Sequence, residues 1–193
     1  MQKVGLFFGS FNPIHIGHLI IGNYMVDHTN LEEVWFVISP HNPLKKKSTL
    51  ANNYDRLYLV QLAIGGNPNL RTSSIEFNLP QPSYTIDTLT HLKEKYPKKE
   101  FTLIMGGDNL RTFHKWKNYE LILRDYTIYV YARPNYELGP FAEHERVQVF
   151  DEVPQMSISA SFIRKNLREG KSIKYLVSEP VFEEIMKSNL YRE

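Results

Sequence analysis

Two histidines three residues apart are the clearest chemical signal in the sequence. His15 and His18 lie in the segment GSFNPIHIGH, directly after the short apolar run of residues 4–8. Side chains three apart share one face of a helix, so both rings can face one ligand at a helix that begins near Ile16. The N-terminal amides of such a helix favour phosphate. We predict a phosphate site here, with a metal site or a purely structural pair as the alternatives.

The loop before these histidines suits close contact with a ligand. Gly9 lets the backbone approach a bound group, and Ser10 and Asn12 offer polar contacts. Pro13 stiffens the turn. Since the chain has no cysteine and no carboxylate lies beside the histidines, nothing nearby completes a metal site, which favours the phosphate interpretation.

A second candidate anion site lies near the end of the chain, in the segment ISASFIR. Ser159 is a good N-cap for a helix that starts at Ala160, and Arg164 could hold phosphate through two hydrogen bonds. The alternative is an ordinary capped surface helix. Two phosphate sites at opposite ends of one chain agree with binding of one triphosphate.

A third candidate follows the apolar run FTLIM. Asp108, in Gly106-Gly107-Asp108, could accept hydrogen bonds from ribose hydroxyls, hold a hydrated metal ion, or only cap the next helix. Trp116 follows eight residues later, and a buried structural tryptophan is the ordinary interpretation of it.

The elements that would position these residues alternate along the chain. We expect one doubly wound α/β domain, Rossmann-like, with a mostly parallel sheet, over residues 1–193. In such folds ligands bind beyond the carboxyl ends of the strands, where the strand order reverses, which directs attention to the loops after residues 9, 39, 106 and 132. The predicted strands are 4–8, 34–39, 70–76, 101–106, 127–132 and 147–150; the predicted helices are 17–28, 53–65, 85–95, 160–168 and 180–188. The first helix is expected to face the core with Leu19, Ile20, Tyr24 and Met25.

The totals exclude several classes of protein. The 193 residues fit one domain, and 42% hydrophobic residues favour a globular protein over a disordered one. A net charge of +2 is too small to indicate a nucleic-acid binder, even with the lysines at 45–47. The apolar run near the N-terminus is too short for a secretory signal or a membrane span, so a cytoplasmic protein without membrane contact is expected.

The first loop resembles the HxGH signature of the nucleotidyltransferase superfamily. Within it, the sequence is most similar to bacterial nicotinate-nucleotide adenylyltransferases, in which the segment reads GG(T/S)FDPxHxGHL. This chain has Phe8 in place of a glycine and Asn12 in place of an aspartate. The segment at 158–164 resembles the family's ISSTxIR motif, with Ala160 and Ser161 as departures.

The resemblance also implies a site for the pyridine nucleotide. Trp116 would stack on the pyridine ring, and the segment 82–88, PSYTIDT, with Thr85, would bind the nicotinate group. Thr85 could at the same time be the N-cap of its helix. Lys45 matches a family lysine, although the preceding histidine of that motif is absent here, and Arg133 would contact the mononucleotide phosphate.

The activity implied by the resemblance is adenylyl transfer from ATP to nicotinate mononucleotide, with release of pyrophosphate, in NAD biosynthesis. His15, His18 and Arg164 would be the catalytic residues. Mg²⁺ would be carried with ATP, without a dedicated protein metal site. The alternatives are another acceptor (nicotinamide mononucleotide or phosphopantetheine) and a non-catalytic ATP sensor, and homo-oligomer formation stays open. The residues expected to bind ATP are Gly9, Ser10, Phe11, His15, His18, Gly106, Asp108, Ser159 and Arg164.

Overall fold

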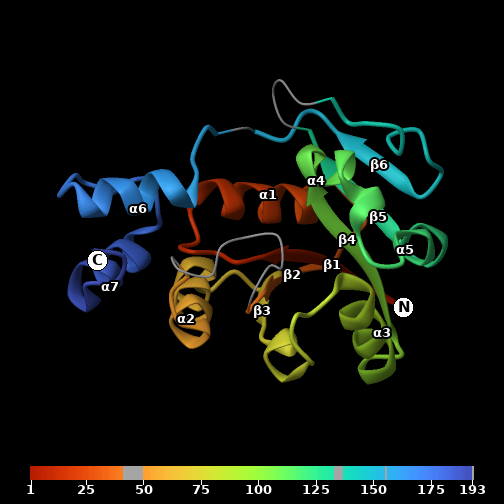
Figure 1. Ribbon diagram of the computed structural model, residues 1–193, viewed down its shortest axis with the longest axis horizontal. Coiled ribbons are helices and arrows are strands. Elements are labelled where there is room, and N and C mark those ends of the chain that lie inside the picture. Colours follow the sequence, from red (N-terminus) through yellow and green to blue (C-terminus); the bar gives the residue numbers. More distant parts are fainter. Residues whose placement is uncertain (41–49, 133–136, 155, 193) are drawn as a thin grey trace.

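A computed structural model describes residues 1–40, 50–132, 137–154 and 156–192. It contains a six-stranded sheet in the order β3-β2-β1-β4-β5-β6, and each of its neighbouring pairs is parallel (Figure 1). The predicted doubly wound α/β fold is therefore confirmed. The strands are β1 (Gln2–Gly9), β2 (Glu33–Ile38), β3 (Leu70–Ser73), β4 (Lys99–Gly106), β5 (Thr127–Tyr131) and β6 (Val147–Phe150).

Helices connect these strands. The five predicted helices are present within a residue or two of their expected ends, whereas two short helices, α4 (Gly107–Arg111) and α5 (Tyr119–Asp125), were missed. Residues 75–76, expected in a strand, belong instead to a 3-10 turn, η2 (Ile75–Asn78). Helices of five and seven residues are too short to show a clear 3.6-residue period. The helices are α1 (Ile16–Asp27), α2 (Asn53–Ile64), α3 (Thr85–Lys95), α4 (Gly107–Arg111), α5 (Tyr119–Asp125), α6 (Ala160–Arg168) and α7 (Glu179–Ser188), with a further 3-10 turn, η3 (Phe113–Lys115).

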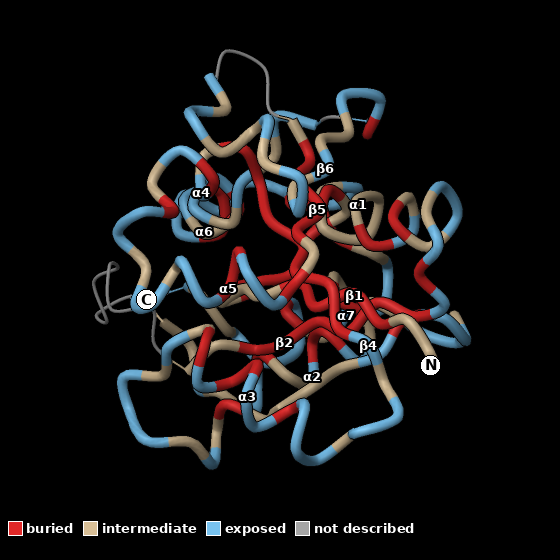
Figure 2. Tube along the Cα trace, turned by 90° about the vertical axis from the view of Figure 1, so that its right-hand side faces the viewer, coloured by how far each residue is buried: buried red, intermediate tan, exposed pale blue. Residues whose placement is uncertain are grey.

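Side chains on successive strand positions enter two different cores. In β4, Phe101 and Leu103 contribute to one core, while Ile104 contributes to the other. The two-residue period of a strand produces this division, and it makes both faces of a parallel sheet apolar. Helices α1, α2, α6 and α7 cover one face, and α3, α4 and α5 cover the other. Figure 2 shows the buried strands inside and exposed chain around them.

Helix α1 packs on the sheet through glycine rather than through its larger side chains. Gly17, Gly22 and Met25 are buried, whereas Leu19, Ile20 and Tyr24 are only half-buried. A β-carbon on Gly22 would lie 2.7 Å from the Phe36 ring. The prediction that Met25 faces the core was thus right, whereas Leu19, Ile20 and Tyr24 are less buried than predicted. The reason is that the glycines allow the helix backbone itself to approach β2.

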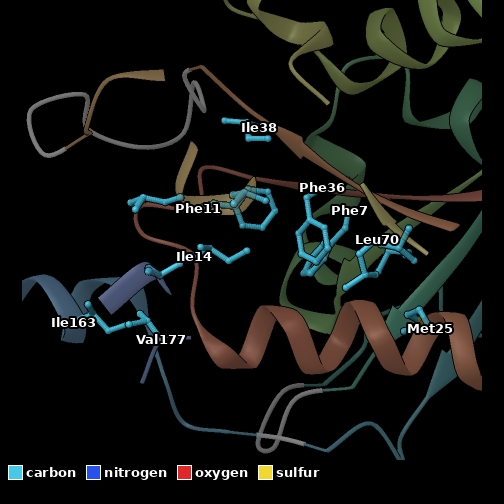
Figure 3. Packing of buried hydrophobic residues seen from close by; sticks show 14 of the residues in the cluster. Phe7, Phe11, Ile14, Met25, Phe36, Ile38, Leu70, Ile163 and Val177 are labelled. Carbon is cyan, nitrogen blue, oxygen red and sulfur yellow. The ribbon is translucent and has the colours of Figure 1, made fainter. Parts of the chain in front are cut away.

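The end of the chain packs against its beginning. Ile163 of α6 and Val177 lie close to Ile14, which precedes α1 (Figure 3). The Ile16 N–H donates a hydrogen bond to the Leu176 carbonyl at 3.0 Å. The C-terminal helices therefore complete the apolar core around the segment that follows β1. None of the helices within the described residues is long and apolar enough to cross a membrane.

The close approach at Gly22 gives a first prediction. Gly22→Ala should lower the free energy of unfolding by about 1 kcal/mol or more, because the new methyl group meets a buried ring and overpacking outweighs the gain in helix propensity. Urea unfolding measures this change. Gly66→Ala is the control, since a β-carbon there meets nothing within 4 Å. Equal effects of the two substitutions would contradict the packing account.

Candidate functional site

The strand order reverses between β1 and β4, which are neighbours at the centre of the sheet. Chain segments leaving these two strands diverge to opposite faces, and this opens a crevice beyond their carboxyl ends. Gly9 ends β1 and Gly106 ends β4. Two of the three predicted nucleotide-binding segments, the loop of residues 10–15 and the turn at Gly106–Asp108, begin at this crevice.

The two histidines lie together, as their spacing predicted. His15 is the N-cap of α1, and its ring stacks on that of His18 with 3.7 Å between the ring centroids. The His15 backbone N–H donates to His18 Nδ1 at 3.2 Å. Because Nδ1 accepts this hydrogen bond, neutral His18 carries its proton on Nε2, which is then a hydrogen-bond donor.

Phe11 anchors the loop that carries the histidines. Its side chain is 2% exposed and its φ is 43°, in the left-handed region. The ring packs edge-on against His18, with 5.1 Å between centroids, and against Phe7 and Phe36. Phe11 was predicted to bind ATP; since its ring is buried, only its backbone remains available for that contact. A β-carbon on Gly9 would lie 2.8 Å from the Phe11 ring, so glycine leaves room for the anchor.

The second predicted anion segment reaches the same loop. Ser159 caps α6, because its Oγ accepts a hydrogen bond from the Phe162 N–H at 3.1 Å. Arg164 Nη1 donates to the carbonyl oxygen of Asn12 at 2.6 Å, and Nη2 donates to Ser161 Oγ at 3.3 Å. Burial is the largest influence on Arg164 and lowers its pKa. The structure thus brings the start of α6 and Arg164 beside the histidine loop, 152 residues earlier in the chain.

The turn after β4 holds Asp108 close to the backbone. The N-cap of α4 is Gly106, not Asp108, so the capping alternative for Asp108 is wrong. A β-carbon on Gly106 would lie 2.5 Å from Asp108 Oδ1. The carboxylate of Asp108 therefore occupies space that is available only because residue 106 is a glycine. Across the described ranges, no group of three or more acidic or histidine side chains could hold a metal ion.

The two described segments of the predicted pyridine site are joined to each other. Lys117 forms an ion pair with Asp87 of α3 at 2.9 Å, and its Nζ lies 4.7 Å from the centre of the Tyr84 ring. This connects the residue after Trp116 with the residue before Thr85 and with the second residue after it. Trp116 is half-buried, with its ring 5.3 Å from that of Phe113.

One prediction for the pyridine site was wrong, and two predicted residues cannot be compared with the structure. Thr85 is the first residue of α3 and not its N-cap, which is Tyr84, so that prediction was wrong. Lys45 and Arg133 lie outside the described residues, as does most of the loop 40–50, for which closure over substrate was a hypothesis.

A buried carboxyl group is hydrogen-bonded to the predicted nicotinate segment, residues 82–88. Glu76 of η2 is 3% exposed, and its Oε1 accepts a hydrogen bond from Thr88 Oγ1 at 2.8 Å. The Glu76 carbonyl accepts one from the side chain of Gln81 at 2.9 Å. Burial raises the pKa of the Glu76 carboxyl group, and hydrogen bonds from Thr88, Ser39 and Ser83 oppose this in part.

Sequence reasoning missed one residue that organises the site. Arg56 of α2 is completely buried, and its guanidinium donates to the backbone carbonyls of Ser10 and Ser39. The available signal was its position: Arg56 precedes Leu59 and Val60 by one turn, on the stripe that faces the core. An arginine on such a stripe needs buried partners.

The chain is similar to known proteins over most of its length. A family model described as Cytidylyltransferase-like matches residues 6–166. A probable nicotinate-nucleotide adenylyltransferase from Flavobacterium psychrophilum is 51% identical over 194 residues and covers 100% of both chains. Its counterpart from Cytophaga hutchinsonii is 52% identical and covers 98% of each chain. The solved structure of Plasmodium falciparum nicotinic acid mononucleotide adenylyltransferase complexed with NaAD has a TM-score of 0.80 at 19% identity, over 99% of this chain and 98% of that one, which is a likeness of fold.

The buried Glu76 predicts a pH dependence of stability. Its folded pKa is raised above the ordinary 4.5, so between the two values the folded protein keeps a proton that the unfolded chain has lost. The free energy of unfolding therefore falls as pH rises from 4.5 through this window. Glu76→Gln cannot ionise, so its stability relative to the parent should increase between about pH 5 and about pH 8 in urea unfolding.

A control separates this effect from general charge changes. Glu94 lies exposed on α3, and Glu94→Gln should follow the parent protein at both pH values. A stability difference between Glu76→Gln and the parent that stays constant with pH would show that Glu76 does not titrate in this way.

Proposed function

The chain belongs to the Cytidylyltransferase-like family and, within it, to the nicotinate-nucleotide adenylyltransferases, and from this membership we propose its activity and the roles of its residues. It transfers the adenylyl group of ATP to nicotinate mononucleotide, giving nicotinate adenine dinucleotide and pyrophosphate in the cytoplasm. The observation that carries the proposal is the convergence of His15, His18 and Arg164 on one loop at the switch point of the sheet.

The reaction needs positioning and charge stabilisation more than acid–base chemistry. An oxygen of the mononucleotide phosphate forms the new bond to the α-phosphorus of ATP, and the bond from that phosphorus to the β-phosphate bridge breaks. The attacking phosphate is already an anion at neutral pH, so no side chain has to remove a proton from it. The protein lowers the barrier by holding the two phosphates in line and by stabilising the developing charge.

His18 is the donor nearest the reacting bond in this proposal. The hydrogen bond from the His15 backbone to Nδ1 fixes the tautomer with the proton on Nε2, and this N–H donates to an ATP phosphate oxygen. The His15 ring, stacked on it, contacts the neighbouring phosphate. Their position at the start of α1 adds the positive end of the helix dipole.

Arg164 and the start of α6 hold the departing pyrophosphate. Arg164 is fixed by its hydrogen bond to the Asn12 carbonyl, and Ser159 stands at the N-terminus of the same helix. A guanidinium and helix amides are donors without acceptors, which suits a leaving group that gains negative charge. Gly9, Ser10, Gly106 and Asp108 complete the ATP site, with Asp108 directed to the ribose.

The acceptor lies on the other side of the crevice. Trp116 stacks on the pyridine ring, and Thr85 at the start of α3 contacts the nicotinate carboxylate. The contacts of Lys117 with Tyr84 and Asp87 support this assignment, because they hold the two segments at a fixed separation. Lys45 and Arg133 contact the mononucleotide.

Magnesium enters as a complex with ATP rather than as a resident ion. The donor set at the crevice consists largely of imidazole, guanidinium and helix amides, which suit phosphate oxygens, and Asp108 is the carboxylate among the assigned residues. Bound to ATP, Mg²⁺ neutralises part of the phosphate charge. The proposed mechanism uses residues of one chain.

The choice of acceptor is tested by pyrophosphate release from MgATP. Nicotinate mononucleotide, nicotinamide mononucleotide and phosphopantetheine are offered separately. Fast release is expected with the nicotinate compound and much slower release with the other two. Fast release with a different acceptor would overturn the roles of Trp116 and Thr85. Tight ATP binding without release for any acceptor would identify a non-catalytic sensor.

The role of His18 predicts a large loss of turnover on its removal. His18→Ala should lower kcat by about 10²–10³, which corresponds to about 2.7–4 kcal/mol for one donor that acts in the transition state. His28, exposed at the other end of α1 and stacked on Tyr24, provides the matched control. His28→Ala should keep the parent's turnover. A kcat for His18→Ala within about threefold of the parent would remove His18 from the mechanism.

A further inference from the structure

Among the described residues, Arg56 is the largest of the fully buried side chains, with 0% exposure. Moving a guanidinium out of water is costly unless its donors find partners in good geometry. Burial is also the main influence on its pKa, which it lowers. The five N–H donors of the group must therefore be satisfied by oxygen atoms inside the protein.

The hydrogen bonds of Arg56 join three separate segments beside the crevice. Nη1 donates to the Ser10 carbonyl in the loop after β1 and, at 2.9 Å, to the Ser39 carbonyl after β2. Nε donates at 3.1 Å to the carbonyl of Ala51, before α2. Nη2 donates at 2.7 Å to the side chain of Asn53. These partners are neutral oxygens, so the guanidinium acts as a spacer between backbone segments rather than as half of an ion pair.

The loop after β1 is held through its carbonyl oxygens along its length. The Gly9 carbonyl accepts from the Ser39 N–H at 2.9 Å, and the Asn12 carbonyl accepts from Arg164. The Asn12 side chain also accepts from the Ala51 N–H at 3.1 Å. Arg56 holds the Ser10 carbonyl, between these two points. The carbonyls of the loop are thus turned toward the protein by donors from β2's end, α2 and α6.

Fixing a carbonyl also fixes the next amide. In a planar trans peptide the C=O and the following N–H point in opposite directions. The Ser10 carbonyl points at the buried Arg56, so the Phe11 N–H points away from it. Phe11 is also held in the left-handed region with its ring in the core, so this peptide has little freedom to rotate. A backbone N–H set in this way is a ready donor to a phosphate oxygen.

We propose that Arg56 is a positioning residue for the nucleotide: by holding the Ser10 carbonyl, it presents the Phe11 N–H to an ATP phosphate. This inference rests on the proposed function, because it takes the loop to be the ATP site. Arg56 itself does not touch ATP. It orients the loop from the buried side, as Arg164 does through Asn12.

The first test compares Arg56→Lys and Arg56→Gln with the parent protein. Lysine keeps the charge but has no planar fork, so it cannot hold three carbonyls at once, and glutamine is shorter and uncharged. Both should raise the Kd and KM for ATP about tenfold or more and lower kcat, whereas the Kd for nicotinate mononucleotide should stay within about twofold. Calorimetry with MgATP in the absence of an acceptor gives the Kd independently of catalysis.

The matched control is Leu59→Ala, one turn further along the same helix. Leu59 is completely buried in the same apolar core, so its truncation should lower Tm through a cavity while it leaves the hydrogen bonds of Arg56 in place. Leu59→Ala should therefore keep the parent's Kd for ATP. An unchanged ATP affinity in Arg56→Lys would overturn the proposal. The proposal would also be overturned if Arg56→Lys, Arg56→Gln and Leu59→Ala all lost affinity for both substrates in proportion to their decrease in Tm.

A measurement on the parent protein keeps the test valid even if the variants fold poorly. Addition of MgATP should shift the backbone amide resonance of Phe11 in ¹⁵N spectra. An amide that does not move on saturation with ATP would contradict the proposal. If the Phe11 amide shifts and the Arg56 variants lose ATP affinity, but no acceptor gives pyrophosphate, the proposed transfer reaction fails while the role of Arg56 stands.

Discussion

The parallel pairing of β1 with both β2 and β4 is the constraint on which the rest of the structure depends. Because β1 is central, the chain leaving it at Gly9 emerges at the point where the connections on the two sides diverge. The loop that follows therefore has a neighbour on each side: the end of β2, with Ser39, and the end of β4, with Gly106. The stacked histidines and the contact of Arg164 with Asn12 are arranged around this position.

The second level of organisation is the pairing of buried polar groups. A loop at the end of a buried strand contains backbone carbonyls that water cannot reach, and each of them needs a hydrogen-bond donor from the protein. Here guanidinium groups supply much of that requirement, from α2 on one side and α6 on the other. In a planar trans peptide, a carbonyl that points inward leaves the following amide pointing outward. The same hydrogen bonds thus stabilise the fold and hold the proposed anion-binding loop in one conformation. Arg56 acts on that loop from the buried side, whereas Arg164, which is also assigned to the pyrophosphate, holds it through Asn12.

The sequence was most informative where a period or a cap determines structure locally. The alternation of apolar runs with helical patterns predicted the parallel sheet, and Ser159 predicted the start of α6. The spacing of His15 and His18 predicted their shared face. Thr85 as an N-cap was wrong because Tyr84 precedes it in extended conformation, and either residue could have ended the loop. Arg56 was missed because most of its partners are backbone carbonyls, which every residue has and which no sequence pattern therefore marks. The buried face of α1 was predicted only in part, because Gly22 packs closely against Phe36 through its lack of a side chain.

The packing of α6 and α7 against the start of α1 also has a consequence for synthesis on the ribosome. The loop after β1 is among the first parts of the chain to emerge, yet Arg164 and the segment around Leu176, which fix it, are among the last. Domains form as their contacts become available, and contacts of such long sequence separation form late. A nascent chain that ends before α6 has its sheet strands and Arg56, but it lacks the contacts of Arg164 and Leu176 with this segment. Nucleotide that binds the completed loop can therefore stabilise the protein fully only after nearly the whole chain has been made.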